Sequence, residues 1–420
     1  MLTKAVRLHG KNDLRLDEFE LAPLRDDEIL ARVVSDSICM SSHKATEQGS
    51  DHKRVPGDIA KNPVIIGHEF CGEILEVGKK WRGKFTAGSK FSIQPALNYK
   101  GSLDAPGYSY RYIGGDATHI VIPNEVMECN CLLPYEGEGY FLASLSEPMS
   151  CIVGAFHASY HTDPGVYAHK MGIVQGGCMA MLAGAGPMGI GAIDYALHCD
   201  RKPGMLVVTD IDEHRLQRAE EIYSTAEAAR CGVNLKYVNT ANHADALAYV
   251  RELTGKNGFD DVFVFAPVKQ LVEQADSLLA RDGCLNFFAG PHSASFSAAL
   301  NFYNVHYAST HVVGTSGGNT DDMREALALM AQKKIRPALM ITHIGGLNAV
   351  VPTTMNLPKI PGGKKLIYTN IALDLTAIDA FAQKAQTDPL FEALAQITAR
   401  HAGVWSVEAE AYLLDHAPKI

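Results

Sequence analysis

A glycine-rich turn between an apolar strand and a helix is the feature that most limits how this chain can fold. The segment GAGPMG spans residues 184–189; it follows the apolar run 179–182 and leads into helical text beginning at Pro187. Such a turn brings backbone N–H groups and the positive end of a helix up to a pyrophosphate. The residues expected to contact a dinucleotide here are Gly184, Gly186, Pro187, Met188 and Gly189.

Short apolar segments alternate with helix-length segments after this turn. This alternation predicts a doubly wound parallel sheet, covered by helices on both faces, of the Rossmann type. The expected strands cover residues 205–210, 235–238, 261–265, 284–288 and 311–315.

An acidic residue follows the second expected strand, about 20 residues beyond the glycine-rich turn. Asp210 can bond the 2′-hydroxyl of a ribose and repel a 2′-phosphate, which favours NAD over NADP. Asp212 is interpreted as the N-cap of the next helix. Arg215 counts against a strict preference for NAD over NADP, because an arginine can accommodate the 2′-phosphate of NADP.

The remainder of the chain has a different character. Residues 1–145 read as short β segments with Gly and Pro turns, followed by a helix over 143–160, a turn-rich stretch over 358–370 and helices to residue 420. We therefore expect an α/β protein with two domains. A β-rich catalytic domain with a C-terminal extension would take 1–157 and 316–420, and the Rossmann domain 158–315.

Charge and composition exclude several classes of partner. The formal net charge is −9 without a long basic run, so duplex nucleic acid and anionic membranes are poor candidates. No run approaches about 20 apolar residues, and the N-terminus lacks the pattern of a signal peptide. The nine cysteines are scattered, which fits a reducing cytoplasm.

A candidate metal site lies in the β-rich part. Cys39, His68 and Glu147 offer a thiolate, an imidazole and a carboxylate, which suit a zinc ion with an open fourth position. Their spacing alone does not establish a site, since a lone cysteine is more often buried filler.

The ordered set of motifs SDSICMSSHKA, VIIGHEFCGEILEVG, GGDATHIVIP, GAGPMG and GTSGG closely resembles the zinc-dependent medium-chain alcohol and polyol dehydrogenase family. The resemblance implies a GroES-like catalytic domain and a Rossmann domain. It implies that Cys39, His68 and Glu147 bind zinc, and that Glu69 is a second-sphere or exchanging ligand. It also implies that Thr315 and Ser316, in GTSGG, face the nicotinamide.

The chain departs from many family members in one respect. The stretch that corresponds to their four-cysteine lobe contains no cysteine, and Cys129 and Cys131 lie later without partners. We therefore expect one catalytic zinc and no structural zinc. By the same resemblance Ser41 is the hydroxyl of a proton relay, and either Lys44 or its neighbour His43 completes the relay.

A narrower resemblance, over the whole chain, is to a sugar-phosphate branch of the family. It implies interconversion of a ketose phosphate and a polyol phosphate, namely L-sorbose 1-phosphate and D-glucitol 6-phosphate, by a homodimer or homotetramer commonly joined through Rossmann edge strands. The phosphate requires a basic pocket. Candidates are Lys44, Lys53, Arg54 and Arg111, with His52 and the tyrosines Tyr108, Tyr110 and Tyr112 shaping the pocket.

Three other functions remain open at this point. The chain could be a dehydrogenase of an unphosphorylated polyol such as sorbitol, a zinc-free quinone or enone reductase, or an NAD-binding module without turnover. Metal analysis of the pure protein distinguishes a zinc-free reductase from a zinc-dependent dehydrogenase. The absence of turnover with any polyol or keto-sugar would indicate the binding module. A comparison of L-sorbose with L-sorbose 1-phosphate as NADH oxidants distinguishes a free polyol substrate from a phosphorylated one.

Overall fold

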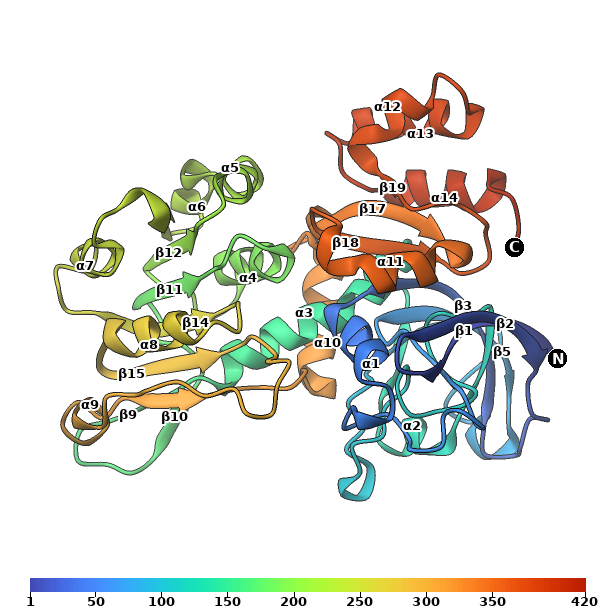
Figure 1. Ribbon diagram of the computed structural model, residues 1–420, viewed down its shortest axis with the longest axis horizontal. Coiled ribbons are helices and arrows are strands. Elements are labelled where there is room, and N and C mark those ends of the chain that lie inside the picture. Colours follow the sequence, from blue (N-terminus) through green and yellow to red (C-terminus); the bar gives the residue numbers. More distant parts are fainter. The chain divides into compact units, whose positions relative to one another are not determined.

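The chain forms two compact units, which the computed structural model describes over residues 1–420. Unit 1 comprises Met1–Pro148, Asn319–Ala331 and Pro337–Ile420, and unit 2 comprises Met149–Gly318 and Gln332–Arg336. Unit 1 is rich in β-structure, whereas strands and helices alternate in unit 2 (Figure 1). None of the helices has the combined length and apolarity needed to span a membrane.

Unit 1 is built around the long strand β3 (Ile29–Ile38). It pairs antiparallel with β5 (Phe70–Val77), β7 (His119–Ile122) and β18 (Lys364–Tyr368) in an eight-stranded sheet. Most β3 side chains are buried, as expected for a strand covered on both faces. The sheet is completed by β6 (Lys90–Ile93), β8 (Leu132–Tyr135), β17 (Ile341–Gly346) and β19 (Thr376–Ala377), and a smaller sheet holds β1 (Leu2–Gly10), β2 (Asp13–Glu20) and β4 (Val64–Ile65).

The prediction of a turn-rich stretch over 358–370 is wrong for its second half. Residues 364–368 form β18, which lies between β3 and β17 and is buried along its whole length. Two lysines open this strand, and an alternating or apolar pattern does not emerge until Leu366. The local sequence therefore resembles a loop, while pairing with β3 and β17 makes it a strand.

Several helices belong to unit 1, and one of them, α3, continues into unit 2. Helix α3 (Tyr140–Ala158) begins three residues before the expected start and is continuous through Pro148 and Gly154. Helix α10 (Thr320–Ala331) is capped by Asn319, whose side chain accepts from the backbone N–H groups of Asp321 and Asp322. The other helices are α1 (Met40–Gln48), α2 (Asn124–Glu128), α11 (Val350–Asn356), α12 (Phe381–Lys384), α13 (Pro389–Arg400) and α14 (Val407–His416).

The C-terminal extension is anchored to α3 by one buried carboxylate. Glu410 on α14 accepts hydrogen bonds from the backbone N–H groups of Tyr140 (2.6 Å) and Phe141 (2.8 Å), and from the hydroxyl of Tyr368 (2.8 Å). The indole of Trp405 donates to the same Tyr368 hydroxyl at 2.7 Å. A carboxylate at a helix N-terminus satisfies orphan N–H groups and the helix dipole. The tail therefore fixes the start of the helix that carries Glu147.

Unit 2 contains a six-stranded sheet in the order β13-β12-β11-β14-β15-β16, and every adjacent pair is parallel. This order confirms the predicted Rossmann sheet, with its reversal between β11 and β14. The strands are β11 (Cys178–Leu182), β12 (Met205–Asp210), β13 (Asn234–Asn239), β14 (Phe259–Val264), β15 (Leu279–Phe287) and β16 (His311–Val313).

The strands are connected by the helices α4 (Pro187–His198), α5 (Glu213–Ile222), α6 (Thr225–Arg230), α7 (Ala246–Glu252), α8 (Lys269–Leu278) and α9 (Phe302–Tyr307). A separate pair of strands is formed by β9 (Tyr160–Thr162) and β10 (His169–Met171). Strand β16 forms one edge of the sheet. The expected homodimer or homotetramer stays a prediction.

The protonation of Glu410 should make stability depend on pH. Burial raises the pKa of Glu410 from 4.5 to about 7. The folded chain then holds a proton that the unfolded chain releases, so this contribution is complete below pH 4.5 and is lost as the pH rises through 7. It amounts to about 3 kcal/mol at most. The free energy of unfolding can be measured by denaturant titration between pH 4 and 8 for the unchanged chain and for Glu410→Gln. With rising pH it should fall less steeply in the variant than in the unchanged chain.

Glu408→Gln, two residues away on α14, is the matched control. Hydrogen bonds from His401 and Arg400 lower the pKa of this exposed carboxyl, so its removal should not flatten the decline. Identical pH profiles for Glu410→Gln and the unchanged chain would contradict the prediction.

Candidate metal centre and nucleotide-binding turn

Two chain reversals bring Cys39 and His68 together. Cys39 follows β3 directly and is the N-cap residue of α1. His68 precedes β5 and follows Gly67, whose φ of 87° lies in the left-handed region. A Cβ at Gly67 would lie 2.6 Å from the backbone nitrogen of Asp116. Glycine is therefore required there, and it sets the direction of the imidazole.

Ligand atoms of Cys39, His68 and Glu69 all lie within 4.8 Å of one another. The Ser41 hydroxyl is 3.0 Å from Cys39 Sγ and 3.2 Å from His68 Nε2, and the Tyr108 hydroxyl is 3.3 Å from that same nitrogen. The other ring nitrogen, Nδ1, is 3.3 Å from the Ser42 hydroxyl. A partner on the second nitrogen fixes the orientation of a metal-binding histidine.

Glu69 is neutralised by a lysine that the sequence interpretation missed. Lys364 Nζ donates to both carboxylate oxygens of Glu69, at 2.5 and 2.6 Å, and both side chains are almost fully buried. Ser37 donates to Glu69 Oε2, and Asp36 accepts from the Glu69 backbone N–H at 3.0 Å. Two lysines opening the apolar run LIY were the available signal for Lys364. Glu69 thus lies in the cluster with its charge already balanced.

Glu147 is a buried residue of α3, and its charge interacts with the charges of the cluster residues His68, Glu69 and Cys39. Burial raises the pKa of Glu147 to about 7; the charge of His68 opposes this shift, and the charges of Glu69 and Cys39 add to it. Burial likewise raises the pKa of the Cys39 thiol, with a further contribution from Glu69. Burial lowers the pKa of His68, which keeps its imidazole neutral. The pocket therefore disfavours both negative charges unless a cation accompanies them.

These donors fit a zinc ion. A thiolate, a neutral imidazole and a carboxylate are ligands that zinc accepts, and three protein ligands leave a position for substrate. Lys364 balances Glu69, so an ionised Cys39 and an ionised Glu147 would leave two negative charges, which a divalent cation neutralises. The fit rests on donor type, burial and charge.

The two candidates for completing the relay lie in different surroundings. His43 Nδ1 bonds the Thr354 carbonyl at 2.8 Å, and its Nε2 lies 3.5 Å from Glu47, so the ring is held between α1 and α11. Lys44 is half-buried; burial lowers its pKa, and the charge of Cys39 acts in the opposite direction. The charge of Cys39 thus acts on Lys44, whereas His43 is bonded away from the cluster; which of the two completes the relay stays a prediction.

The nucleotide-binding turn lies between β11 and α4. Ala183, the residue before Gly184, has a positive φ of 53°. A Cβ at Gly189 would lie 1.8 Å from the Gly184 carbonyl oxygen, so that glycine permits close packing of helix and turn. A Cβ at Gly186 would meet no atom within 4 Å. Pro187 is the first residue of α4, followed by Met188, so the helix N-terminus begins as predicted.

Asp210 ends β12 beside this turn. Its carboxylate accepts from the backbone N–H groups of Ala185 (3.3 Å), Ile211 (2.9 Å) and Asp212 (3.2 Å). Asp212 is the N-cap of α5, as predicted, because its side chain accepts from the Arg215 N–H.

The guanidinium of Arg215 is 3.6 Å from Asp212. Thr315 and Ser316 follow β16, and Ser316 is exposed.

The residues expected to bind a substrate phosphate differ in their burial and in their contacts. Arg111 is exposed, lies over Tyr112 and donates to Asn62. Lys53 is exposed, whereas Arg54 is half-buried against the buried ring of Tyr108. Tyr110 is half-buried and packs against the core beneath the eight-stranded sheet.

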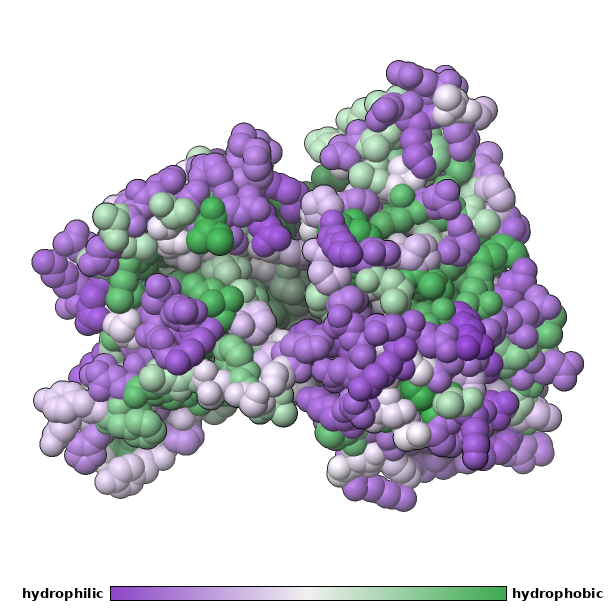
Figure 2. Space-filling view, viewed as in Figure 1, coloured by the Kyte–Doolittle hydropathy of each residue, from purple (hydrophilic) through white to green (hydrophobic).

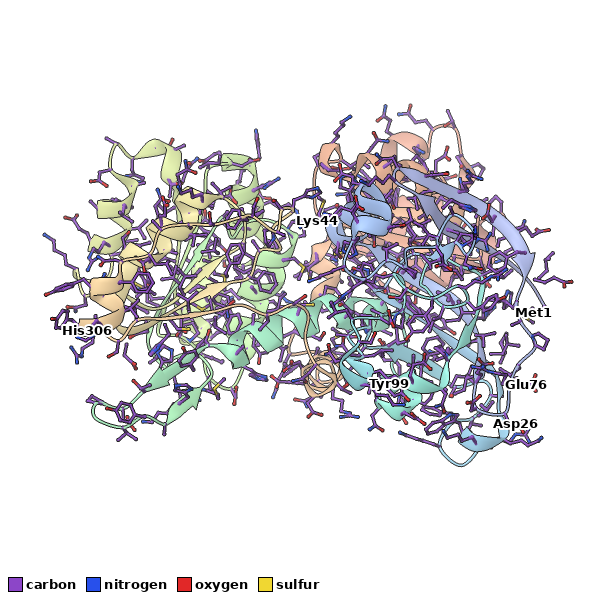
Figure 3. The ribbon with its side chains drawn as sticks, turned by 60° about the horizontal axis from the view of Figure 1, so that its bottom comes forward. Met1, Asp26, Lys44, Glu76, Tyr99 and His306 are labelled. Atoms are coloured by element: carbon purple, nitrogen blue, oxygen red, sulfur yellow. The ribbon has the colours of Figure 1, made fainter.

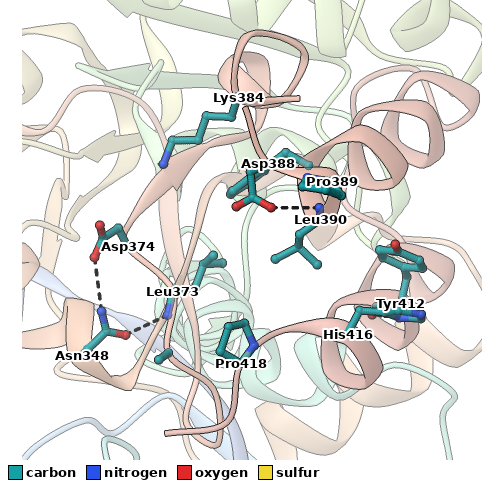
Figure 4. A pocket seen from close by; sticks show the side chains of 12 residues that line it. Asn348, Leu373, Asp374, Lys384, Asp388, Pro389, Leu390, Tyr412, His416 and Pro418 are labelled. Carbon is teal, nitrogen blue, oxygen red and sulfur yellow. Dashed lines mark hydrogen bonds between the residues drawn. The ribbon is translucent and has the colours of Figure 1, made fainter. Parts of the chain in front are cut away.

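A cavity of about 650 Å³ lies in the C-terminal extension and includes none of the predicted site residues (Figure 4). Its polar side chains are used internally: Asn348 bonds Asp374 and the Leu373 N–H, and Asp388 accepts from the Leu390 N–H at the start of α13. Lys384 bonds Thr376. These contacts hold the tail together and offer no group to the metal cluster.

Comparisons with known proteins agree with this geometry. Residues 25–129 match the alcohol dehydrogenase GroES-like domain, and residues 187–332 match the zinc-binding dehydrogenase domain. L-sorbose 1-phosphate reductase of Klebsiella pneumoniae is 54% identical over 100% of this chain and 98% of its own. Mannitol-1-phosphate 5-dehydrogenase of Aliivibrio fischeri is 52% identical over 98% of this chain and 97% of its own.

Among solved structures, 2R,3R-butanediol dehydrogenase of Bacillus subtilis superimposes with a TM-score of 0.71 at 21% identity, over 88% of this chain and 100% of that one. The chain belongs to the zinc-dependent medium-chain alcohol and polyol dehydrogenase family. It is accordingly an oxidoreductase of the alcohol dehydrogenase class (EC 1.1.1), and membership implies zinc and a nicotinamide cofactor. Both the family and the fold expected from the motifs are confirmed.

Removing Lys364 should be costly because it leaves Glu69 buried without its counter-charge. Lys364→Met should lower the free energy of unfolding by about 3–5 kcal/mol. Adding Glu69→Leu should recover most of this loss, since the uncompensated carboxylate is then also absent. Denaturant unfolding of the two single variants and the double variant measures the coupling.

Lys79→Met is the control for the lysine substitution. Lys79 pairs with Asp26 on an exposed surface, so its loss should cost less than about 1 kcal/mol. Similar losses for Lys364→Met and Lys79→Met would show that the buried pair contributes no more than a surface pair.

Proposed function

We propose that the chain is an NAD(H)-linked dehydrogenase that uses one zinc ion and interconverts a ketose phosphate and a polyol phosphate. The proposed pair is L-sorbose 1-phosphate and D-glucitol 6-phosphate. The cluster of Cys39, His68 and Glu69, whose ligand atoms lie within 4.8 Å of one another, is the observation that carries the zinc chemistry. Glu147 is assigned as the third ligand because it is buried and its charge interacts with those of His68 and Cys39, while Glu69 is paired with Lys364. The two curated relatives at 54% and 52% identity are both named for sugar phosphates or their polyols, which supports the substrate class.

Cys39, His68 and Glu147 would hold the zinc in this proposal, while Glu69 stays on Lys364. Bound zinc supplies Lewis acidity at the substrate oxygen, and bound nicotinamide gives or takes the hydride. Ser41 Oγ, beside Cys39 Sγ and His68 Nε2, can accept one proton while donating another, so it suits the start of a relay. Lys44 would continue the relay.

The cofactor is proposed to be NAD(H). Gly184, Gly186 and Gly189 would let the pyrophosphate approach the start of α4. The Asp210 carboxylate at the end of β12 would bond a ribose hydroxyl and disfavour a 2′-phosphate. Because Arg215 is 3.6 Å from Asp212, its charge is partly engaged already.

The experiment for the substrate is an assay of NADH oxidation against a panel of ketose phosphates, with free L-sorbose and a quinone beside them. We expect the fastest turnover with L-sorbose 1-phosphate, faster with NADH than with NADPH, and its loss after chelation. A preference for D-fructose 6-phosphate would instead indicate a mannitol phosphate enzyme. Faster turnover of free L-sorbose would indicate an unphosphorylated polyol, and chelator-resistant quinone reduction a zinc-free enzyme.

The zinc proposal predicts a specific set of losses. Metal analysis of the purified chain should give one zinc per chain, and Cys39→Ser and Glu147→Gln should each lower the bound zinc at least tenfold at equal free zinc. Cys131→Ser is the control, because Cys131 Sγ contacts Thr320 Oγ1 at 3.5 Å and belongs to no metal-binding group. Two zinc ions per chain, or full zinc content in Glu147→Gln, would contradict the proposed ligand set.

A further inference from the structure

A group of basic side chains lies near the Cys39 and His68 cluster, within unit 1. Lys44 lies on α1, and His52, Lys53 and Arg54 follow the short 3-10 helix Gly49–Asp51. Hydrophilic residues gather on the surface over α1 (Figure 2), and Lys44 projects outward from that helix (Figure 3). The sequence names four candidates for the phosphate without choosing among them, and Arg54 is one of the four.

A single aromatic ring joins Arg54 to the candidate zinc ligand. The Arg54 guanidinium carbon lies 5.5 Å from the centre of the Tyr108 ring, and the His52 ring stacks on Tyr108 at 5.6 Å with an angle of 10°. The Tyr108 ring is 4.8 Å from the His68 ring, and its hydroxyl reaches His68 Nε2. The guanidinium is therefore one ring away from the metal cluster.

The Arg54 backbone is held by two hydrogen bonds, but one nitrogen of its side chain has no partner. Its carbonyl accepts from the Ser109 hydroxyl at 2.6 Å, and its N–H donates to His52 Nδ1 at 3.3 Å. The Arg54 Nε atom is buried and has no hydrogen-bond partner. Buried donors are normally paired, so this N–H is open to an acceptor that the protein itself does not supply. A guanidinium presents several N–H donors in a fork that matches phosphate oxygens.

The charges facing this position are positive. Burial lowers the pKa of His52 to about 4, and the positive charges of Arg54, Lys53 and Lys44 lower it further, so the His52 ring is neutral and the cations are these three side chains. The nearby acids are already engaged: Glu47 lies beside His43, and Asp51 pairs with Lys11 at 2.5 Å. A dianion entering here would meet cations and an unfilled donor.

We propose that Arg54, assisted by Lys44, binds the phosphate of a phosphorylated substrate whose carbonyl or hydroxyl group lies at the Cys39 and His68 cluster. This inference rests on the proposed function, which supplies the sugar phosphate. In a 2-ketose 1-phosphate the ester carbon is the direct neighbour of the carbonyl carbon. An anion site one aromatic ring from a zinc ligand matches that short separation. Arg54 is then the residue that distinguishes phosphorylated from free sugars.

The test compares Arg54→Gln and Arg54→Lys with the full-length, zinc-loaded chain. We expect Arg54→Gln to raise KM for L-sorbose 1-phosphate at least tenfold with a smaller change in kcat, and to weaken competitive inhibition by inorganic phosphate similarly. Arg54→Lys should retain part of the affinity, because it keeps the charge and loses the fork. Arg111→Gln, an exposed arginine outside this group, should change neither value.

Phosphate binding followed by ³¹P NMR separates failure of this inference from failure of the proposed function. Phosphate that binds the unchanged chain and not Arg54→Gln supports the anion site even if no ketose phosphate is turned over. Turnover of ketose phosphates with the same KM in Arg54→Gln and Arg111→Gln overturns the role of Arg54 and leaves the function standing. Phosphate binding that Arg54→Gln does not weaken also overturns it.

Discussion

The charge balance inside one buried cluster constrains the chemistry of unit 1. Glu69 and Lys364 neutralise each other at 2.5 and 2.6 Å, away from water. The charge of Lys364 also lowers the pKa of Cys39 and of Glu147, but burial outweighs it and raises the pKa of each. A buried site holds two such anions only beside a cation. Without Lys364, Glu69 would add a third negative charge to the same cluster.

The surrounding fold keeps this cluster in place. Cys39 is supplied by the end of β3, His68 by the reversal at Gly67, and Lys364 by β18, which pairs with β3. Glu147 depends on α3, whose first turn is held by Glu410 from the C-terminal extension. Segments far apart in sequence therefore contribute one group each. The tail acts through the helix and adds no ligand of its own.

Sequence patterns were sufficient where local chemistry determines structure. The glycine-rich turn, the strand ending at Asp210 and the N-cap at Asp212 each follow from a few adjacent residues, and the parallel sheet follows from their repetition. The motifs also pointed to Cys39 and His68, which the structure brings within 4.8 Å of each other.

Sequence patterns failed where pairing across the chain decides the outcome. Lys364 and Lys365 open a strand that reads as a loop until β3 and β17 are placed beside it. The anchoring role of Glu410 depends on a contact between residues 270 positions apart. Arg54 could be named as a candidate, but its orphan donor and its place over Tyr108 are visible only in three dimensions. Long-range partners of this kind leave no local periodicity.

A crystal structure of the zinc-loaded chain with anomalous diffraction at the zinc edge would test the account most directly. The account predicts one peak per chain, bound by the sulfur of Cys39 at about 2.3 Å, by an imidazole nitrogen of His68 and by the Glu147 carboxylate, with Glu69 still on Lys364. A peak bound by Glu69 with Lys364 displaced, or no peak at this cluster, would contradict it.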